Sequence, residues 1–207
     1  ALREKLQRLQ SLGYLSEVSN YGRARTAARR YAVADPAHRF HQRFVEPNTS
    51  TIERFGAKQV WNDLVKPHLD TYMGHVFERI VEQAYSRLAS VRNLPLLREW
   101  GRWEGSVRDG GSAEVDVVAS LAVGEQMLTG SIKWGNRPRP LKDYFDHRRA
   151  LELIARSGQA WAHRAMEPQS PMLFVSASGF ASGFKDVAEE DGRDVHLLTL
   201  DDLYKAV

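Results

Sequence analysis

The stretch SAEVDVVASLAVGEQMLTGSIKWGN, residues 112–136, constrains the fold more than any other part of the chain. Two apolar runs flank a turn that contains glycine, a pattern typical of a β-hairpin with buried strands. Glu114, Asp116 and Lys133 lie inside these runs. Charged side chains are seldom buried unless they pair with one another or hold a metal ion. The sequence therefore predicts a hairpin that contains an ion pair or a metal site.

Alternation along the strands predicts how these charges are arranged. Side chains two residues apart share a face, so Glu114 and Asp116 are expected on one side, as are Ser131 and Lys133. If the strands pair around the turn at Gly124, Asp116 and Lys133 come close together, each about eight residues from the turn. Such carboxylates can hold a divalent metal ion, and the lysine can position an attacking water. The alternative is a buried ion pair that only fixes the strand register.

The residues around the hairpin predict one sheet covered by helices. Apolar residues at helical spacing indicate a helix over residues 59–88, broken near Pro67, and another over residues 141–163. Runs typical of strands lie at residues 99–104, 113–123, 126–134, 171–177 and 195–200. The order helix, three strands, helix, strand, strand predicts an α/β sandwich around a mixed central sheet.

The N-terminal part of the chain is basic. Residues 1–58 contain 11 Lys+Arg and 5 Asp+Glu, whereas the remainder contains 18 and 21. Leucines at helical spacing end at Gly13, and a strand, a basic loop and a second strand ending at Asp35-Pro36 follow. A helix followed by a basic hairpin is the order found at the end of a winged helix, which binds DNA. The expected contacts to nucleic acid from this hairpin are Arg23, Arg25, Arg29 and Arg30.

Composition excludes several other classes. The chain has no cysteine, which excludes disulfides, thiolate zinc sites and a cysteine nucleophile, and fits a cytoplasmic protein. Hydrophobic residues make up 43% and charged residues 27%, the balance of an ordinary folded domain. No apolar run is long enough to span a bilayer, so we expect no membrane partner.

The words GHVFERI, SAEVDVVAS and GSIKW, preceded by HQRFVEPN, resemble one known family. It is the C-terminal domain of unknown function (domain of unknown function 234) attached to archaeal-type P-loop ATPases, within the PD-(D/E)xK nuclease superfamily. The resemblance implies a restriction-endonuclease-like sandwich over residues 69–207, after a helical linker over residues 36–68. Residues 1–35 would be the last helix and wing of a winged helix, cut from a larger protein. An N-terminal ATPase domain, which would bind ATP, is then a partner, and a homo-oligomer remains open.

The resemblance assigns roles to residues of the hairpin. Glu78 would be the helix carboxylate, Asp116 the central metal ligand and Lys133 the catalytic lysine. The position two before that lysine is an acid in the family and is Ser131 here, which supplies no charge to a metal ion. The implied cofactor is Mg²⁺, with Mn²⁺ as substitute, held by Asp116, Glu78 and Glu114. Arg137 and Arg139 follow the lysine strand and are expected to contact phosphates.

Three functions remain open. The first is a nucleic-acid-binding, nuclease-like domain of a larger ATPase with a degenerate metal site and weak or no cleavage. The second is an active Mg²⁺-dependent DNA endonuclease in which Glu114 or Glu82 replaces the missing acid at Ser131. The third is a regulatory or oligomerisation domain of the ATPase that does not contact nucleic acid.

Overall fold

The computed structural model describes residues 2–18, 20–22, 30–108 and 110–205 of the 207-residue chain. The chain divides into two compact units, one of residues 1–19 and 23–76 and one of residues 20–22 and 77–207. Among the described residues, no helix combines the length and the apolar character that a membrane crossing requires.

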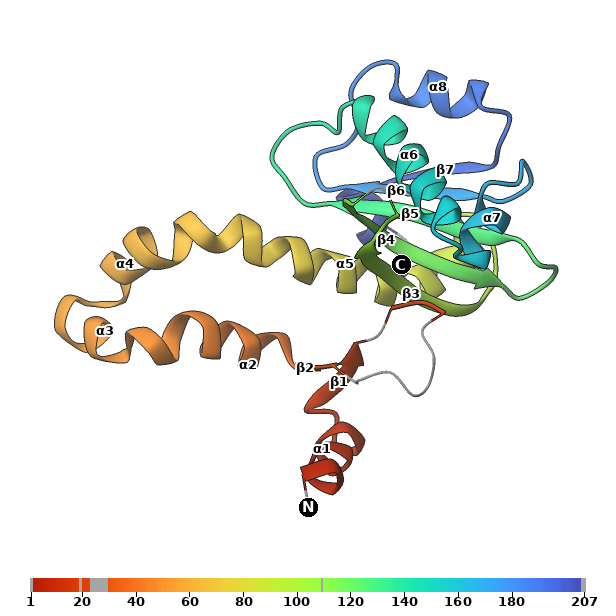
Figure 1. The fold of residues 1–207 in the computed structure, drawn as a ribbon. Coiled ribbons are helices and arrows are strands. Elements are labelled where there is room, and N and C mark those ends of the chain that lie inside the picture. The colour runs from red at the N-terminus through yellow and green to blue at the C-terminus, as the bar shows by residue number, and fades with distance from the viewer. Residues whose placement is uncertain (1, 19, 23–29, 109, 206–207) are drawn as a thin grey trace. The chain divides into compact units, whose positions relative to one another are not determined.

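The N-terminal unit contains a helix, a hairpin and a series of short helices (Figure 1). In chain order the elements are α1 (Leu2–Ser11), β1 (Leu15–Val18), β2 (Arg30–Val33), α2 (Pro36–Phe40), the π-helical η1 (His41–Val45), the 3-10 turn η2 (Glu46–Asn48), α3 (Thr49–Phe55), α4 (Ala57–Val60), the π-helical η3 (Trp61–Val65) and the first part of α5 (Lys66–Val91). The predicted helix and hairpin are confirmed, with β1 antiparallel to β2. Asp35 caps α2 by accepting a hydrogen bond of 2.7 Å from the His38 amide, and Pro36 is the first residue of the helix.

The second unit contains the predicted sheet. Its elements after α5 are β3 (Leu97–Ser106), β4 (Ser112–Leu121), β5 (Met127–Lys133), α6 (Lys142–Arg156), α7 (Ala160–Ala165), β6 (Met172–Ser176), α8 (Phe184–Glu190), β7 (Val195–Thr199) and α9 (Leu200–Tyr204). The strand order is β3-β4-β5-β6-β7. The first three strands are antiparallel, whereas β6 runs parallel to β5 and β7 parallel to β6. The mixed α/β sheet predicted from the sequence is therefore confirmed.

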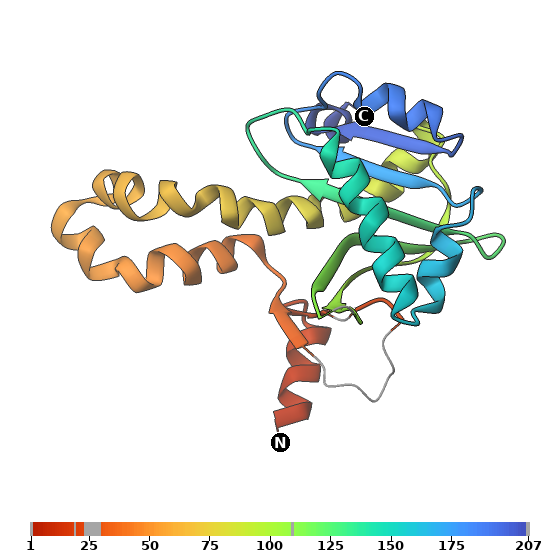
Figure 2. The ribbon, with the colours of Figure 1, turned by 45° about the horizontal axis from the view of Figure 1, so that its top comes forward.

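Helices cover both faces of this sheet (Figure 2). One hydrophobic core lies between the sheet and α6, α7 and α8, with Leu151, Trp161 and Phe184 at its centre. The other lies between the sheet and α5 and α9, and contains Phe77 and Leu88. A strand that is buried on both faces must be apolar along its length, which is why β6 reads Met-Leu-Phe-Val-Ser with every residue buried.

Three helical features differ from the prediction. The expected helix over residues 141–163 is two helices, α6 and α7, because the chain turns at Gly158, whose φ of +89° favours glycine. The sequence did not predict α8 or α9, which are only seven and five residues long. Helices this short show too little periodicity to be recognised, although the capping box formed by Thr199 and Asp202 marks the start of α9.

Gly130 provides a test of the sheet packing. A Cβ atom there would lie 2.1 Å from the carbonyl oxygen of Leu173 on the neighbouring strand β6. We predict that Gly130→Ala lowers the free energy of unfolding by about 2 kcal/mol, because the two backbones must move apart. Gly135→Ala is the matched control, since its Cβ would meet no atom within 4 Å. Urea denaturation measures both, and equal stabilities would contradict this packing.

Candidate functional site

The site begins at a β-bulge in β4. Between the pairs Gly101–Val118 and Trp103–Val115, β4 has two residues where β3 has one. The first of the two is Asp116. A bulge bends its strand and re-aims the side chains in it, and bulges are common next to functional sites. The regular alternation expected along this strand is therefore interrupted at Asp116.

The carboxylate of Asp116 accepts hydrogen bonds from β5 beyond the point where the main chains of β4 and β5 stop pairing. The strands pair as far as Val117 and Gly130. Beyond that point, Asp116 Oδ2 accepts a hydrogen bond of 2.7 Å from the Ile132 amide and one of 2.9 Å from the Ser131 hydroxyl. The expected neighbour of Asp116 across the ladder was Lys133. That prediction was wrong by two residues, because the register continues to Ser131.

Lys133 pairs with an acid that the sequence analysis did not select. Its Nζ donates a hydrogen bond of 3.0 Å to Oδ2 of Asp143, at the start of α6. The Lys133 side chain is 54% exposed, whereas that of Asp143 is 14% exposed. The lysine is therefore accessible to solvent and is tied to α6.

Arg139 is the buried cation of this region. It was expected to contact phosphates, but only 3% of its surface is exposed, so this prediction was wrong. Its Nη1 donates to the carbonyl oxygens of Ser131 at 2.7 Å and Val175 at 3.4 Å. Its Nε donates to Asp143 at 3.2 Å, and its guanidinium carbon lies 5.2 Å from the centre of the Phe174 ring. Arg139 thus joins β5, β6 and α6 from inside.

Arg139 also reaches the motif position that lacks an acid. Its Nη2 donates a hydrogen bond of 2.6 Å to Ser131 Oγ, and the Ser131 hydroxyl donates to Asp116. Burial lowers the pKa of Arg139, and the nearby Asp143 and Asp116 oppose that shift. An arginine keeps its charge even so. The result is a link from guanidinium to hydroxyl to carboxylate, which neutralises Asp116 without a metal ion.

A second arginine holds the remaining acids. Arg102 lies on β3, and its Nη1 is 3.6 Å from Oε2 of Glu78 on α5. Its Nη2 contacts Glu114 and lies 3.4 Å from Glu104. The sequence analysis did not select Arg102. A charged residue in the aromatic run EWGRWEG, inside a predicted strand, was the signal that marked it.

Among the acids of the site, the carboxyl of Glu78 has the pKa that departs most from its ordinary value. Burial, followed by the charge of Asp116, raises the pKa of its carboxyl to about 7, while Arg102 opposes and Glu114 adds to the rise. A carboxyl with this pKa is close to half protonated at neutral pH. It is therefore a weaker ligand for a cation than an ordinary glutamate.

These donors do not fit a magnesium site. Mg²⁺ requires charged oxygens with a near-octahedral geometry. Here Ser131 supplies only a hydroxyl that is bonded to a guanidinium, and Glu114 contacts Arg102. Over the part of the chain that the structure describes, no three Asp, Glu or His side chains gather in a way that could hold a metal ion.

The other basic residues selected from the sequence differ in accessibility. Arg30 and Arg137 are exposed. Nearby on α6, the half-buried Arg148 donates to both oxygens of Asp191, at 2.7 and 2.8 Å, so its charge is paired within the fold. The three wing arginines Arg23, Arg25 and Arg29 lie outside the described residues.

Arg139 allows a direct test of the buried link. Arg139→Met is predicted to lower the free energy of unfolding by about 3 kcal/mol, because it removes the donor to the Ser131 and Val175 carbonyl oxygens and one of the two cations that hold Asp143. Arg137→Met is the matched control, since Arg137 is exposed in the same loop, and a change below about 0.5 kcal/mol is expected. Chemical denaturation of both variants measures the difference. Similar losses would contradict the internal role of Arg139.

Glu78 predicts a pH dependence of stability. In the unfolded chain its proton leaves near pH 4.5, and in the folded protein near pH 7, so folding takes up a proton between these values. The free energy of unfolding should therefore fall as the pH rises through this window, by about 2 kcal/mol. Glu78→Gln should remove this fall. Denaturation of both proteins at pH 5 and pH 8 tests it, and parallel losses would contradict the raised pKa.

Comparisons with solved structures show a partial likeness to three of them. A repair endonuclease from Pyrococcus abyssi is 16% identical with a TM-score of 0.36, over 57% of this chain and 46% of that one. The structure of an EndoMS–dsDNA complex is 14% identical with a TM-score of 0.33, over 57% and 44%. The DNA modification-dependent restriction endonuclease AspBHI is 19% identical with a TM-score of 0.33, over 62% and 33%. The chain spans less than half of each.

Comparison with models of protein families identifies the family of the chain. No curated protein matches the chain. A family model described as "Archaea bacterial proteins of unknown function" (DUF234) matches residues 41–145, which is half of the chain. The matched segment contains Glu78, the bulged strand with Asp116, and Arg139. The chain therefore belongs to the DUF234 family.

Proposed function

We propose that this chain is a nucleic-acid-binding module with a nuclease-like sheet that cleaves weakly or not at all. The observation that supports the lack of cleavage is the link from Arg139 through Ser131 to Asp116. A fixed positive charge beside Asp116 repels a divalent cation, and the repulsion is strongest where the dielectric constant is low. The acids thus keep the sheet in register rather than hold Mg²⁺.

Charge supports the nucleic-acid half of this proposal. Residues 1–58 carry a surplus of six positive charges. The helix α1 and the β1–β2 hairpin have the order of a winged helix, and Arg30 and Arg137 are exposed. By resemblance to its family, the module would bring an ATPase domain of the same protein to DNA. The phosphate backbone would supply most of the affinity.

Salt-dependent binding tests this half. Fluorescence anisotropy with labelled duplex and single-stranded DNA, between about 50 and 200 mM salt, should show an affinity that falls steeply as salt increases. Asp116→Ala should leave that affinity unchanged, because the Asp116 carboxylate is engaged by the Ile132 amide and the Ser131 hydroxyl of β5 and adds no positive charge for phosphate. No binding at the lowest salt would contradict the proposal and favour a regulatory or oligomerisation domain.

A cleavage assay tests the other half. With Mg²⁺ or Mn²⁺, the natural sequence should leave plasmid DNA intact. Ser131→Glu should also remain inactive, because the new carboxylate would pair with Arg139 instead of a metal ion. Cleavage by the natural sequence that Asp116→Ala abolishes would contradict the proposal. It would favour an active endonuclease in which Glu114 or Glu82 supplies the missing acid.

A further inference from the structure

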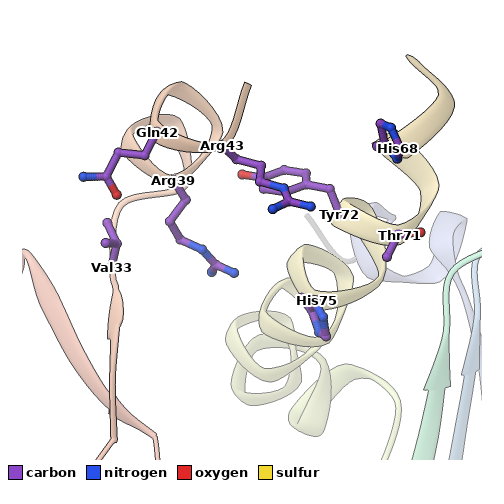
Figure 3. Close-up of a pocket in the computed structure, with 8 residues that line it drawn as sticks. All are labelled: Val33, Arg39, Gln42, Arg43, His68, Thr71, Tyr72 and His75. Atoms are coloured by element: carbon purple, nitrogen blue, oxygen red, sulfur yellow. The ribbon is translucent and has the colours of Figure 1, made fainter. Parts of the chain in front are cut away.

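A pocket in the N-terminal unit lies apart from the motif residues (Figure 3). It has a volume of about 550 Å³ and lies between α2–η1 and the first part of α5. Its polar lining consists of Arg39, Gln42, Arg43, His68, Thr71 and His75. All six side chains can donate hydrogen bonds, and none is acidic.

Two helices present these donors toward one space. Arg39 and Arg43 are four residues apart on one helical segment, so they share a face. His68, Thr71 and His75 are spaced by three and four residues along α5, which also places them on one face. Figure 3 shows both arginine side chains extending from their own helix toward the side that carries α5. Gln42 points to the opposite side in the same view, so the groups that face one another across the pocket are the two arginines and the α5 residues.

Within the described residues, no carboxylate is paired with the two arginines of the pocket. Neither Arg39 nor Arg43 forms an ion pair with a carboxylate in the described ranges. Like charges four residues apart on a helix destabilise it, by a few tenths of a kcal/mol. An anion bound between them would relieve this repulsion. Both Arg148 and Arg139, by contrast, are held by aspartates of the fold.

The packing of Tyr72 favours phosphate binding over base stacking in this pocket. Its ring packs edge-on against Phe40 and Phe44, with ring centres 5.9 and 5.3 Å apart. Its hydroxyl donates a hydrogen bond of 3.1 Å to the Pro36 carbonyl oxygen. The ring is thus committed to the small core of this unit and fixes the spacing of the two helices. It provides a rigid floor and does not offer a free aromatic face to a base.

We propose that this pocket binds a phosphate group, and that the group is a phosphodiester of the nucleic-acid backbone. The two guanidinium groups can each donate a pair of parallel hydrogen bonds to phosphate oxygens. The Thr71 hydroxyl and the imidazole groups of His68 and His75, on α5, complete the set of donors. The nucleic-acid source rests on the proposed function, whereas the phosphate site rests on the pocket itself.

The test uses the full chain and a pair of matched double variants. Arg39→Gln/Arg43→Gln removes both pocket charges, and Arg54→Gln/Lys58→Gln removes two exposed charges elsewhere in the same unit. Anisotropy with a duplex and calorimetry with inorganic phosphate measure binding. The DNA affinity of the pocket variant should be about tenfold lower. Its plot of log K against log salt should be shallower by roughly one unit of slope or more. The control variant should keep the slope to within about half a unit.

The outcomes separate this inference from the proposed function. DNA binding that the pocket variant retains at full strength, in a protein that melts like the natural sequence, would overturn the pocket while leaving the function. If the natural sequence binds inorganic phosphate but no DNA, and the pocket variant binds neither, the phosphate site stands and the nucleic-acid source fails. Absence of both phosphate and DNA binding overturns both. Arg39→Lys/Arg43→Lys, which keeps the charges without the paired donors, should fall between the natural sequence and the glutamine variant.

Discussion

The guanidinium group of Arg139 is the charge on which the centre of the sheet depends. It is buried, and a buried cation is tolerated only when acceptors surround it. Those acceptors come from β5, β6 and the start of α6, so the arginine fixes the end of the parallel part of the sheet to the helix above it. Through the Ser131 hydroxyl it also determines the charge environment of Asp116.

This arrangement explains why a largely apolar hairpin can contain charged residues. Arg139 balances Asp116 and Asp143, and Arg102 balances Glu78, Glu104 and Glu114. Two arginines thus supply the positive charge that metal ions supply in other clusters of carboxylates. The balance around Glu78 is incomplete, since burial and Asp116 still raise the pKa of its carboxyl to about 7. Removing Arg139 would leave buried acceptors without their donor, whereas removing Arg102 would take a cation from the half-buried Glu78 and from the exposed Glu104 and Glu114.

Apolar periodicity made the sheet predictable, whereas the site was harder to predict. The strands β4, β5 and β6 were found because their apolar runs are bounded by glycine or proline, and the mixed sheet followed from the order of elements. The hairpin of β4 and β5 is centred one residue earlier than expected, so its register places Asp116 opposite Ser131 instead of Lys133. The bulge at Asp116 adds one residue to β4 opposite β3, and alternation alone reveals neither feature. Arg139 lies in a loop between two prolines, a context that predicts exposure. Its burial depends on acceptors from β6, about 36 residues later in the chain.

The position of a cation at Asp116 tests the account most directly. A crystal soaked in millimolar Mn²⁺, measured for anomalous scattering, would locate the metal independently of any activity. We expect no manganese at Asp116 or Glu78, and a guanidinium group of Arg139 that is still hydrogen-bonded to Ser131. A manganese ion coordinated by an oxygen of Asp116, with Arg139 turned away from Ser131, would contradict it.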